Sequence, residues 1–491
     1  MGKPNILIFM TDQQQAQVID EAHPCRMPHV EKFAREGLTF DRTFTTMAHC
    51  CPSRASFFTG LYPSEHGIHN NVSTATAIQK ELNPGVETFG EKLRDAGYSM
   101  HFSGKWHISA AENPADRGWD ELKVNAGKDV FMGATIDTWR SQNVNVKTHA
   151  ERQPGELQRP GWDEFVLYGT NEKSYEETDD YEVVKKAKER LVELAGAEQP
   201  WCMYVGVLGP HDPFIVPSKY ATMYDSSEVE LPPNYYDSLQ TKPRIYQRMR
   251  QVWGQLSECE VKESIAHYWG YCTMVDDLFG EVLETLERTV QSDNTLVVFL
   301  SDHGESGGAH GLYLKGISPY EETYRIPCVI RWPDGINEPG RHVHSLVSIM
   351  DFAPTFMEIA QVDTLNGGGS GLSLLPWLRN EDVKAEHWRD AVFNQCNGVE
   401  ILYTQRMVRT ERYKFVYNPC DFDELYNLHD DLYEMVNLAD DPEQKPLVAW
   451  LYRKMWREAA ASGDRIFNQY PSIAMAAIGP ALAIGVGAED E

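Results

Sequence analysis

Residues 6–13 read Ile6-Leu7-Ile8-Phe9-Met10-Thr11-Asp12-Gln13, an unbroken apolar run that leads into a polar cluster. A run without alternation of polar and apolar residues is typical of a strand that is buried on both faces of a parallel sheet. Ligands of such sheets bind at the carboxyl ends of the strands. The stretch therefore predicts a central strand, with Asp12 and Gln13 at the end where a functional site is expected.

Three further segments repeat this pattern of an apolar strand followed by polar residues. They are Tyr98–Phe102 before Ser103-Gly104-Lys105, Trp201–Leu208 before Gly209-Pro210-His211, and Thr295–Leu300 before Ser301-Asp302-His303. Between the strands, helices are predicted over Val86–Ala96, Tyr181–Ala195 and Glu260–Leu286. Alternating strands and helices predict an α/β domain with a mostly parallel sheet, and the four polar strand ends should converge at one edge of it.

The pattern changes after about residue 375, where shorter strands follow one another. The predicted elements are strands over Ala391–Asn394, Met407–Arg409 and Tyr413–Tyr417 and a helix over Leu447–Ala459. We therefore expect a catalytic α/β domain over residues 1–375 and a small antiparallel sheet with a packed helix over residues 376–470.

Three other segments do not follow either pattern. Residues 112–180 and 215–258 lack clean periodicity and are predicted to be long insertions over the sheet, where substrate specificity is expected. The Ala- and Gly-rich tail, residues 471–491, is broken by Pro480 and is too short for a typical membrane span. We expect it to be an arm that docks on its own chain or on a neighbouring subunit of a homo-oligomer.

The composition excludes several classes of function. The 491-residue chain has a formal net charge of −28 and a pI near 5.0, whereas proteins that bind nucleic acid or anionic membranes carry an excess of Lys and Arg. A site for an anion must therefore gather its cations locally. Nine cysteines without a Cys-x-x-Cys pair suggest neither a disulfide framework nor a structural zinc site. Met1-Gly2-Lys3-Pro4-Asn5 runs straight into the first strand without a leader, so a cytoplasmic protein is expected.

Residues 50–54 read Cys50-Cys51-Pro52-Ser53-Arg54 and continue into an apolar segment. Pro52 suits the first turn of a helix, which places Cys50 at the helix N-terminus. Unpaired backbone N–H donors and the helix dipole lower a thiol pKa there and stabilise anions. Arg54, one turn further on, adds a permanent cation. From these residues alone, a buried structural cysteine pair beside a helix start is an equally open interpretation.

The Cys-x-Pro-x-Arg pattern of residues 50–54 resembles the signature of the type I sulfatases, members of the alkaline phosphatase superfamily. The resemblance implies an alkaline-phosphatase-like α/β sandwich with a large central, mostly parallel sheet flanked by helices and a small C-terminal antiparallel subdomain. It also implies hydrolysis of a sulfate monoester with S–O cleavage. In this family the first cysteine, Cys50 here, is oxidised by a formylglycine-generating enzyme to Cα-formylglycine, whose hydrate is the nucleophile.

The resemblance further implies a site for one divalent metal. Asp12, Asp302 and His303 match the family's metal-binding positions, and Gln13 and the oxygen derived from Cys50 would complete the ligand set. Many sulfatases have a second acidic residue in place of Gln13 and an asparagine in place of His303. Oxygen ligands favour Ca²⁺, which we expect, and the histidine makes Mn²⁺ the alternative.

Four further residues match family positions around the sulfate group. In Gly104-Lys105-Trp106-His107 the resemblance assigns Lys105 to the sulfuryl oxygens and His107 to the formylglycine hydroxyl. His211 and Lys315 match positions beside the bridging oxygen, where a proton or a positive charge assists the leaving alcohol. Arg54 would hold the nucleophile.

Two features bear on the substrate. The spacing from Asp302-His303-Gly304 to Lys315 resembles the iduronate and choline sulfatase branches more than the arylsulfatases. Asn71 matches a substrate-side asparagine of phosphonate monoester hydrolases, relatives that share the signature but tend to lack the Lys and His found here at 105 and 107. A small sulfate ester is therefore the expected substrate, and phosphonate monoester or phosphodiester hydrolysis is the alternative. If Cys50 is not matured, the chain would instead be a non-catalytic anion-binding protein.

Overall fold

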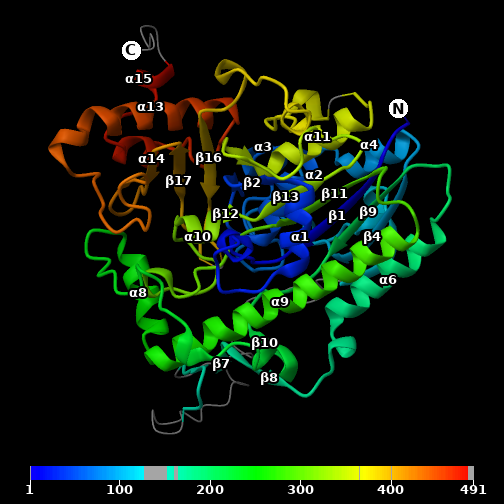
Figure 1. Ribbon diagram of the computed structural model, residues 1–491. Helices are drawn as coiled ribbons and strands as arrows, with labels where there is room; N and C mark the ends of the chain where they lie inside the picture. The colour runs from blue at the N-terminus through cyan, green and yellow to red at the C-terminus, as the bar shows by residue number, and fades with distance from the viewer. Residues whose placement is uncertain (1, 126–151, 160–163, 364, 400, 485–491) are drawn as a thin grey trace.

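An eight-stranded sheet forms the centre of the computed structural model, which describes residues 2–125, 152–159, 164–363, 365–399 and 401–484 (Figure 1). Across the sheet the strands are β14 Arg341–Val343, β2 Leu38–Phe40, β13 Cys328–Arg331, β11 Thr295–Ser301, β1 Asn5–Thr11, β9 Trp201–Gly206, β4 Ser99–Lys105 and β5 Asp120–Asn125. The five strands from β11 to β5 are parallel to one another, and β13 is antiparallel to both of its neighbours. The expected mostly parallel sheet is confirmed.

Helices cover both faces of the sheet, and alternate residues of β1 face the two layers. Leu7 and Phe9 pack with helices α1 Pro28–Glu36, α6 Asp179–Glu193 and α9 Glu258–Arg288. Ile6, Ile8 and Met10 pack with helices α2 Cys50–Thr59, α4 Phe89–Asp95 and α11 Phe352–Ile359. The strand is apolar throughout because both of its faces are buried. The three helices predicted from periodicity correspond to α4, α6 and α9.

A four-stranded antiparallel sheet follows in the C-terminal part, as predicted. Its strands, in order, are β16 Ala391–Cys396, β17 Gln405–Thr410, β18 Tyr413–Tyr417 and β19 Glu424–Asn427. Helix α13 Lys445–Ala461 packs on this sheet through Leu451, Met455 and Trp456. The domain boundaries expected at residues 375 and 470 stay predictions.

The described part of the tail docks on its own chain. Its helices α14 Tyr470–Met475 and α15 Ala481–Ile484 lie beside α13 (Figure 1). Trp456 Nε1 donates to the backbone oxygen of Ile478 at 2.6 Å. Residues 485–491 lie outside the described residues, and an oligomer arm stays a prediction. Among the described residues, no helix is both long enough and apolar enough to cross a membrane.

The predicted insertions need a correction, because part of the first one belongs to the central sheet. Residues 120–125 form the edge strand β5, which pairs in parallel with β4. Residues 126–151 and 160–163 of that segment lie outside the described residues. The second segment contains helix α8 Arg244–Trp253, in which Ile245, Met249 and Trp253 recur at helical spacing, a pattern that sequence reasoning overlooked.

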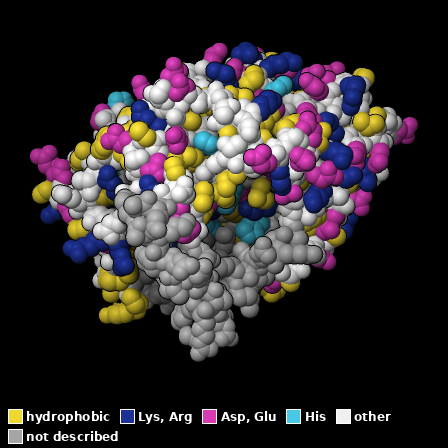
Figure 2. Space-filling view, turned by 90° about the horizontal axis from the view of Figure 1, so that it is seen from below, with side chains coloured by type: hydrophobic (Ala, Val, Ile, Leu, Met, Phe, Trp, Pro, Cys, Tyr) yellow, Lys and Arg dark blue, Asp and Glu magenta, His cyan; other side chains and the backbone are white. Residues whose placement is uncertain are grey.

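The remaining short elements connect these layers. They are β3 Thr43–Phe44, β6 Glu156–Leu157, β7 Phe165–Val166, β8 Tyr168–Asn171, β10 Phe214–Pro217, β12 Arg325–Ile326, β15 Val347–Ser348, α3 Pro63–His66, α7 Ser218–Ala221, α10 Glu321–Tyr324 and α12 Leu375–Leu378. Acidic and basic side chains are interspersed over the face seen in Figure 2, which has a hollow where His and Lys or Arg side chains are visible.

Candidate active site

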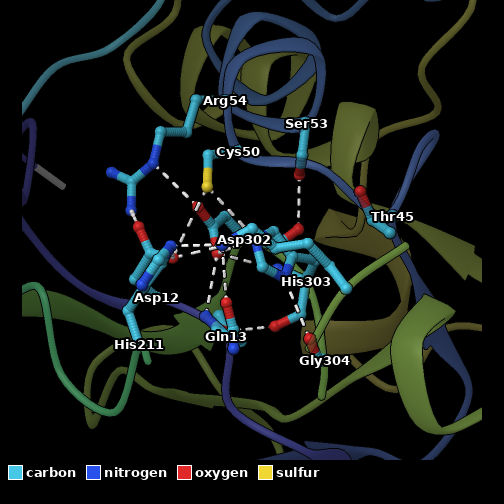
Figure 3. Close-up of polar contacts among 12 residues, drawn as sticks. Asp12, Gln13, Thr45, Cys50, Ser53, Arg54, His211, Asp302, His303 and Gly304 are labelled. Atoms are coloured by element: carbon cyan, nitrogen blue, oxygen red, sulfur yellow. Dashed lines mark hydrogen bonds and ion pairs between the residues drawn. The ribbon is translucent and has the colours of Figure 1, made fainter. Parts of the chain in front are cut away.

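The polar residues that follow the four predicted strands converge, as expected. Asp12 follows β1, Lys105 ends β4 and Asp302 follows β11. His211 lies in the turn after β9. Figure 3 shows Asp12, His211 and Asp302 grouped around one centre. The parallel sheet thus brings together residues that lie up to 290 positions apart in the sequence.

Helix α2 places Cys50 at this centre, because Cys50 is the first residue of the helix. Two contacts fix the start of the helix. Ser53 Oγ donates to the backbone oxygen of Asp302, and Asn71 Oδ1 accepts from Cys51 N at 3.2 Å. The predicted substrate residue Asn71 thus lies beside the helix N-terminus with one amide oxygen engaged, and its role toward substrate stays a prediction.

Asp12, Cys50, Asp302 and His303 form a fully buried cluster, and one ligand atom from each lies within 4.8 Å of all the others. Cys50 Sγ lies 3.2 Å from His303 Nε2 and 3.6 Å from Asp12 Oδ1. His303 Nδ1 donates to the backbone oxygen of Gly304 at 2.9 Å, which turns the lone pair of Nε2 toward the cluster. Two carboxylates and an imidazole, with the Cys50 side chain beside them, are a donor set that can hold one divalent ion.

Arg54 forms ion pairs with both carboxylates through their Oδ2 atoms. Its Nε donates to Asp302 Oδ2 at 2.8 Å and its Nη2 to Asp12 Oδ2 at 3.0 Å. Its Nη1 donates to Tyr204 Oη at 2.8 Å and to the backbone oxygen of Lys105 at 3.1 Å. Because Arg54 takes the Oδ2 atoms, the Oδ1 atoms face the cluster. There the Oδ1 of Asp302 also accepts from Gln13 N at 3.2 Å and from His303 N at 2.9 Å.

Gln13 is placed differently from the other predicted metal ligands, because both ends of its amide contact side chains. Its Oε1 accepts from Lys315 Nζ at 2.6 Å, while its Nε2 donates to Asp212 Oδ1 at 3.0 Å and to Glu305 Oε2 at 2.5 Å. The amide oxygen therefore faces a cation. A role of Gln13 as a metal ligand stays a prediction, and its present contacts make it a bridge between Lys315 and two carboxylates.

Two predicted cations, Lys105 and Lys315, surround the approach to the cluster together with His211. Lys105 Nζ lies 2.5 Å from Asp12 Oδ2. Lys315 Nζ contacts His211 Nε2, and His211 Nδ1 donates to the backbone oxygen of Asp212 at 2.7 Å. The side chains of Lys105, Lys315 and His211 are 12%, 10% and 23% exposed, whereas the cluster itself has no exposure. A substrate would therefore meet these side chains before the buried cluster.

The cations stabilise negative charge at position 50. Although burial would raise the pKa of the Cys50 thiol, Lys105 and Lys315 lower it well below its ordinary value. Burial and the charge of Cys50 would likewise raise the pKa of Asp12, but nearby cations, of which Lys105 has the largest effect, hold it well below its usual range. The site thus gathers cations locally in a strongly acidic protein, as expected from the composition.

His107 lies near the nucleophile position with a neutral ring. Burial lowers the pKa of His107, and its Nε2 lies 3.3 Å from Ser73 Oγ. Its Nδ1 is buried and has no hydrogen-bond partner within the described part of the chain. A neutral imidazole with one unengaged nitrogen can accept a proton.

Sequence reasoning missed several buried residues that hold the site in place. Asp180 in α6 accepts from Leu208 N at 2.6 Å and from Gly209 N at 2.8 Å, which fixes the turn that carries His211. Glu305 accepts from Gln13. The sequence around Asp180 did not indicate a role at the site, because acidic residues are common in the first turn of a helix. Glu305 follows the Asp-His-Gly motif directly, and this position could have indicated a role.

Comparison with known proteins agrees with this geometry. Residues 4–362 match the family model described as Sulfatase, and residues 308–461 match the one described as N-sulphoglucosamine sulphohydrolase, C-terminal. Uncharacterized sulfatase YidJ from Escherichia coli (strain K12) is 30% identical over 90% of this chain and 84% of its own. Choline-sulfatase from Rhizobium meliloti (strain 1021) is 28% identical over 90% of this chain and 83% of its own.

A solved structure shows the same fold at lower identity. Phosphonate monoester hydrolase SpPMH from Silicibacter pomeroyi matches with a TM-score of 0.76 and 23% identity, over 95% of this chain and 97% of its own. The Sulfatase model spans most of the present chain, including every residue of the buried cluster. The chain therefore belongs to the type I sulfatase family of the alkaline phosphatase superfamily and is a sulfuric ester hydrolase.

Proposed function

We propose that the protein cleaves the S–O bond of a sulfate monoester with Cα-formylglycine derived from Cys50 and one divalent ion. The observation that carries the proposal is the position of Cys50, at the N-terminus of α2 and within the buried cluster of Asp12, Asp302 and His303. A thiol is a soft ligand among oxygen donors. The hydrated aldehyde supplies the nucleophilic oxygen, and the ion supplies Lewis acidity next to it.

The surrounding side chains have distinct tasks in this reaction. Arg54 holds Asp12 and Asp302 in place through two ion pairs. Lys105 and Lys315 neutralise the sulfuryl oxygens as negative charge develops on them. Lys315 and His211, which contact each other, provide the proton that the leaving alcohol needs. His107 accepts a proton at Nδ1 when the residue-50 hydroxyl is deprotonated and sulfate departs.

Cys50→Ala tests the proposal directly. The variant should lose turnover of 4-nitrophenyl sulfate, because it lacks the nucleophile and one proposed metal ligand, and it should keep a nearly unchanged fold, because the side chain is small. Cys51→Ala is the matched control, since Cys51 is equally buried but lies outside the cluster. After coexpression with a formylglycine-generating enzyme, the peptide that contains residue 50 should be roughly 18 Da lighter than its sequence mass. Full activity with an unmodified Cys50 would contradict the mechanism.

We propose Ca²⁺ as the ion, with Mn²⁺ as the second candidate. Three of the four ligand atoms would be oxygens, from Asp12, Asp302 and residue 50, and oxygen-rich sites suit Ca²⁺. The imidazole of His303 is the feature that favours Mn²⁺.

A small sulfate ester is the proposed substrate class. The net charge of −28 would repel a polysulfated polymer at long range. The similarity to Choline-sulfatase from Rhizobium meliloti supports a small alkyl sulfate.

Hydrolysis of phosphonate monoesters or phosphodiesters is the second candidate function, supported by the fold shared with the phosphonate monoester hydrolase. A comparison of kcat/KM for 4-nitrophenyl sulfate, 4-nitrophenyl phenylphosphonate and bis(4-nitrophenyl) phosphate separates the two. We expect the sulfate to be preferred, because Lys105 and His107 are both present at the site. If Cys50 is never matured, the protein would bind anions through a free thiol site without turnover.

A further inference from the structure

We propose, on the basis of the proposed sulfatase reaction, that Glu305 is a positioning residue for Lys315. Glu305 has no exposed surface and lies between two residues of the site, His303 and Lys315, in the same segment of chain. Two independent sets of contacts connect its carboxylate to Lys315.

The first connection runs through the backbone. Glu305 Oε1 accepts from Leu314 N at 2.6 Å and from Gly307 N at 2.9 Å, which closes the loop that ends at Lys315. Ser306 supports the same closure, because its Oγ donates to the backbone oxygen of Leu314 at 2.7 Å. One buried carboxylate, together with Ser306, therefore helps to set the backbone position from which the Lys315 side chain extends.

The second connection runs through the amide of Gln13. Glu305 Oε2 accepts from Gln13 Nε2 at 2.5 Å, and Asp212 Oδ1 accepts from the same nitrogen at 3.0 Å. A carboxylate can only accept, so these two contacts force the NH₂ group of Gln13 toward Glu305 and its oxygen toward Lys315. Gln13 Oε1 then holds Lys315 Nζ at 2.6 Å.

The consequence concerns the leaving alcohol. Lys315 contacts His211, and the proposed reaction assigns this pair to protonation of the departing oxygen. Delivery of a proton matters for an alkoxide, which is a poor leaving group, and little for 4-nitrophenolate, which leaves without protonation. Glu305 should therefore matter more for alkyl sulfates than for activated aryl sulfates.

Glu305→Gln tests this inference. If the new Oε1 keeps its contacts with Leu314 and Gly307, the new NH₂ group faces the NH₂ group of Gln13. A rotation of the Gln13 amide would relieve this contact between two donors. The same rotation would turn the NH₂ group of Gln13 toward Lys315 Nζ, which is also a donor. We expect kcat/KM for an alkyl sulfate to fall about tenfold further than kcat/KM for 4-nitrophenyl sulfate. Metal content, measured by elemental analysis, should not change.

Glu424→Gln is the matched control. Glu424 is also a fully buried carboxylate, in β19 of the C-terminal sheet, and it accepts from Tyr246 Oη at 3.0 Å and from Asn418 Nδ2 at 3.1 Å. Any loss of kcat/KM in Glu424→Gln should be equal for the alkyl sulfate and for 4-nitrophenyl sulfate. Gln13→Leu removes the amide bridge while leaving the loop contacts of Glu305. Because Gln13 is also a predicted metal ligand, the metal content of this variant is measured as well. At unchanged metal content it should reproduce the selective loss even if Glu305→Gln does not fold.

Three outcomes are distinguishable. A selective loss for the alkyl sulfate in either variant supports the inference. Equal losses for both substrates, in Glu305→Gln or, if that variant does not fold, in Gln13→Leu, overturn it while the proposed function stands. A matured wild-type protein that hydrolyses neither sulfate overturns the proposed function and this inference with it.

Discussion

Arg54 Nε lies 2.8 Å from Asp302 Oδ2, and neither side chain has any exposed surface. This ion pair joins the helix that carries the nucleophile position to the end of strand β11. The same guanidinium also binds Asp12, at the end of β1, so one residue of the Cys-x-Pro-x-Arg signature aligns two carboxylates of the buried cluster. Breaking a buried pair costs roughly 3–5 kcal/mol because it leaves an uncompensated charge.

Arg54→Lys should therefore impair both stability and catalysis. An ammonium group cannot make the separate contacts to Asp12, Asp302 and Tyr204 that the guanidinium makes. We expect kcat/KM for 4-nitrophenyl sulfate to fall at least about 100-fold and the free energy of unfolding to fall by about 3 kcal/mol, measured by urea denaturation. Arg94→Lys, at a side chain 52% exposed, should change neither quantity. A loss of activity below about tenfold in Arg54→Lys would contradict the assignment.

Four central strands were predictable because burial on both faces leaves an unbroken apolar run. The predicted runs fall on β1, β4, β9 and β11. Strand β5 was missed because it lies at the sheet edge, and its sequence Asp-Glu-Leu-Lys-Val-Asn is partly exposed and carries charges. An edge strand has no continuous apolar signal, so composition alone cannot reveal it.

The site was predictable in its residues but not in all of its contacts. Asp12 and His303 lie at the ends of strong strands, where topology alone brings them together. The orientation of Gln13 depends on Asp212 and Glu305, which lie 199 and 292 positions away in the sequence. No local pattern encodes which end of an amide faces a lysine, because that choice follows from the tertiary arrangement of acceptors.

Removal of the metal should abolish activity and lower the thermal midpoint. Without an ion, the Oδ1 atoms of Asp12 and Asp302 face each other across the cluster, while Arg54 contacts only their Oδ2 atoms. After chelation and dialysis, we expect Ca²⁺ to restore more activity than Mn²⁺ at equal free concentration. His303→Asn replaces the nitrogen ligand by an amide oxygen and should increase the preference for Ca²⁺ further. Recovery with Mn²⁺ alone would show that the imidazole decides the identity of the ion.

Asp180→Asn should weaken catalysis through the turn that carries His211. The two oxygens of Asp180 accept from Leu208 N and Gly209 N, and an asparagine can serve only one of these donors. We expect kcat/KM to fall about tenfold and the free energy of unfolding to fall by about 1–2 kcal/mol. Asp179→Asn, at an exposed position of the same helix start, is the matched control and should change neither. An unchanged kcat/KM in Asp180→Asn would mean that the turn is held by other contacts.

Asp237 should contribute stability that is lost at acid pH. Although burial alone would raise the pKa of Asp237, the hydrogen bond from His310 and the charge of Lys242 lower it to about 2. A carboxyl whose folded pKa lies below its unfolded value of about 3.9 stabilises the protein fully above that value. The contribution then disappears as the pH falls from about 4 toward 2.

Asp237→Asn removes the titrating carboxyl and tests whether its stabilising effect is lost as the pH falls. The free energy of unfolding of the variant should be roughly 2 kcal/mol lower than that of the wild type at pH 6. The difference in unfolding free energy between wild type and variant should shrink between pH 4 and pH 3. In this range the Asp237 carboxyl of the unfolded wild-type chain takes up a proton, which lowers the free energy of the unfolded state. Urea denaturation at each pH measures both proteins, and Asp95→Asn, at a side chain 68% exposed, should follow the wild type throughout. A difference that stays constant from pH 6 to pH 3 would show that Asp237 acts through packing and not through its charge.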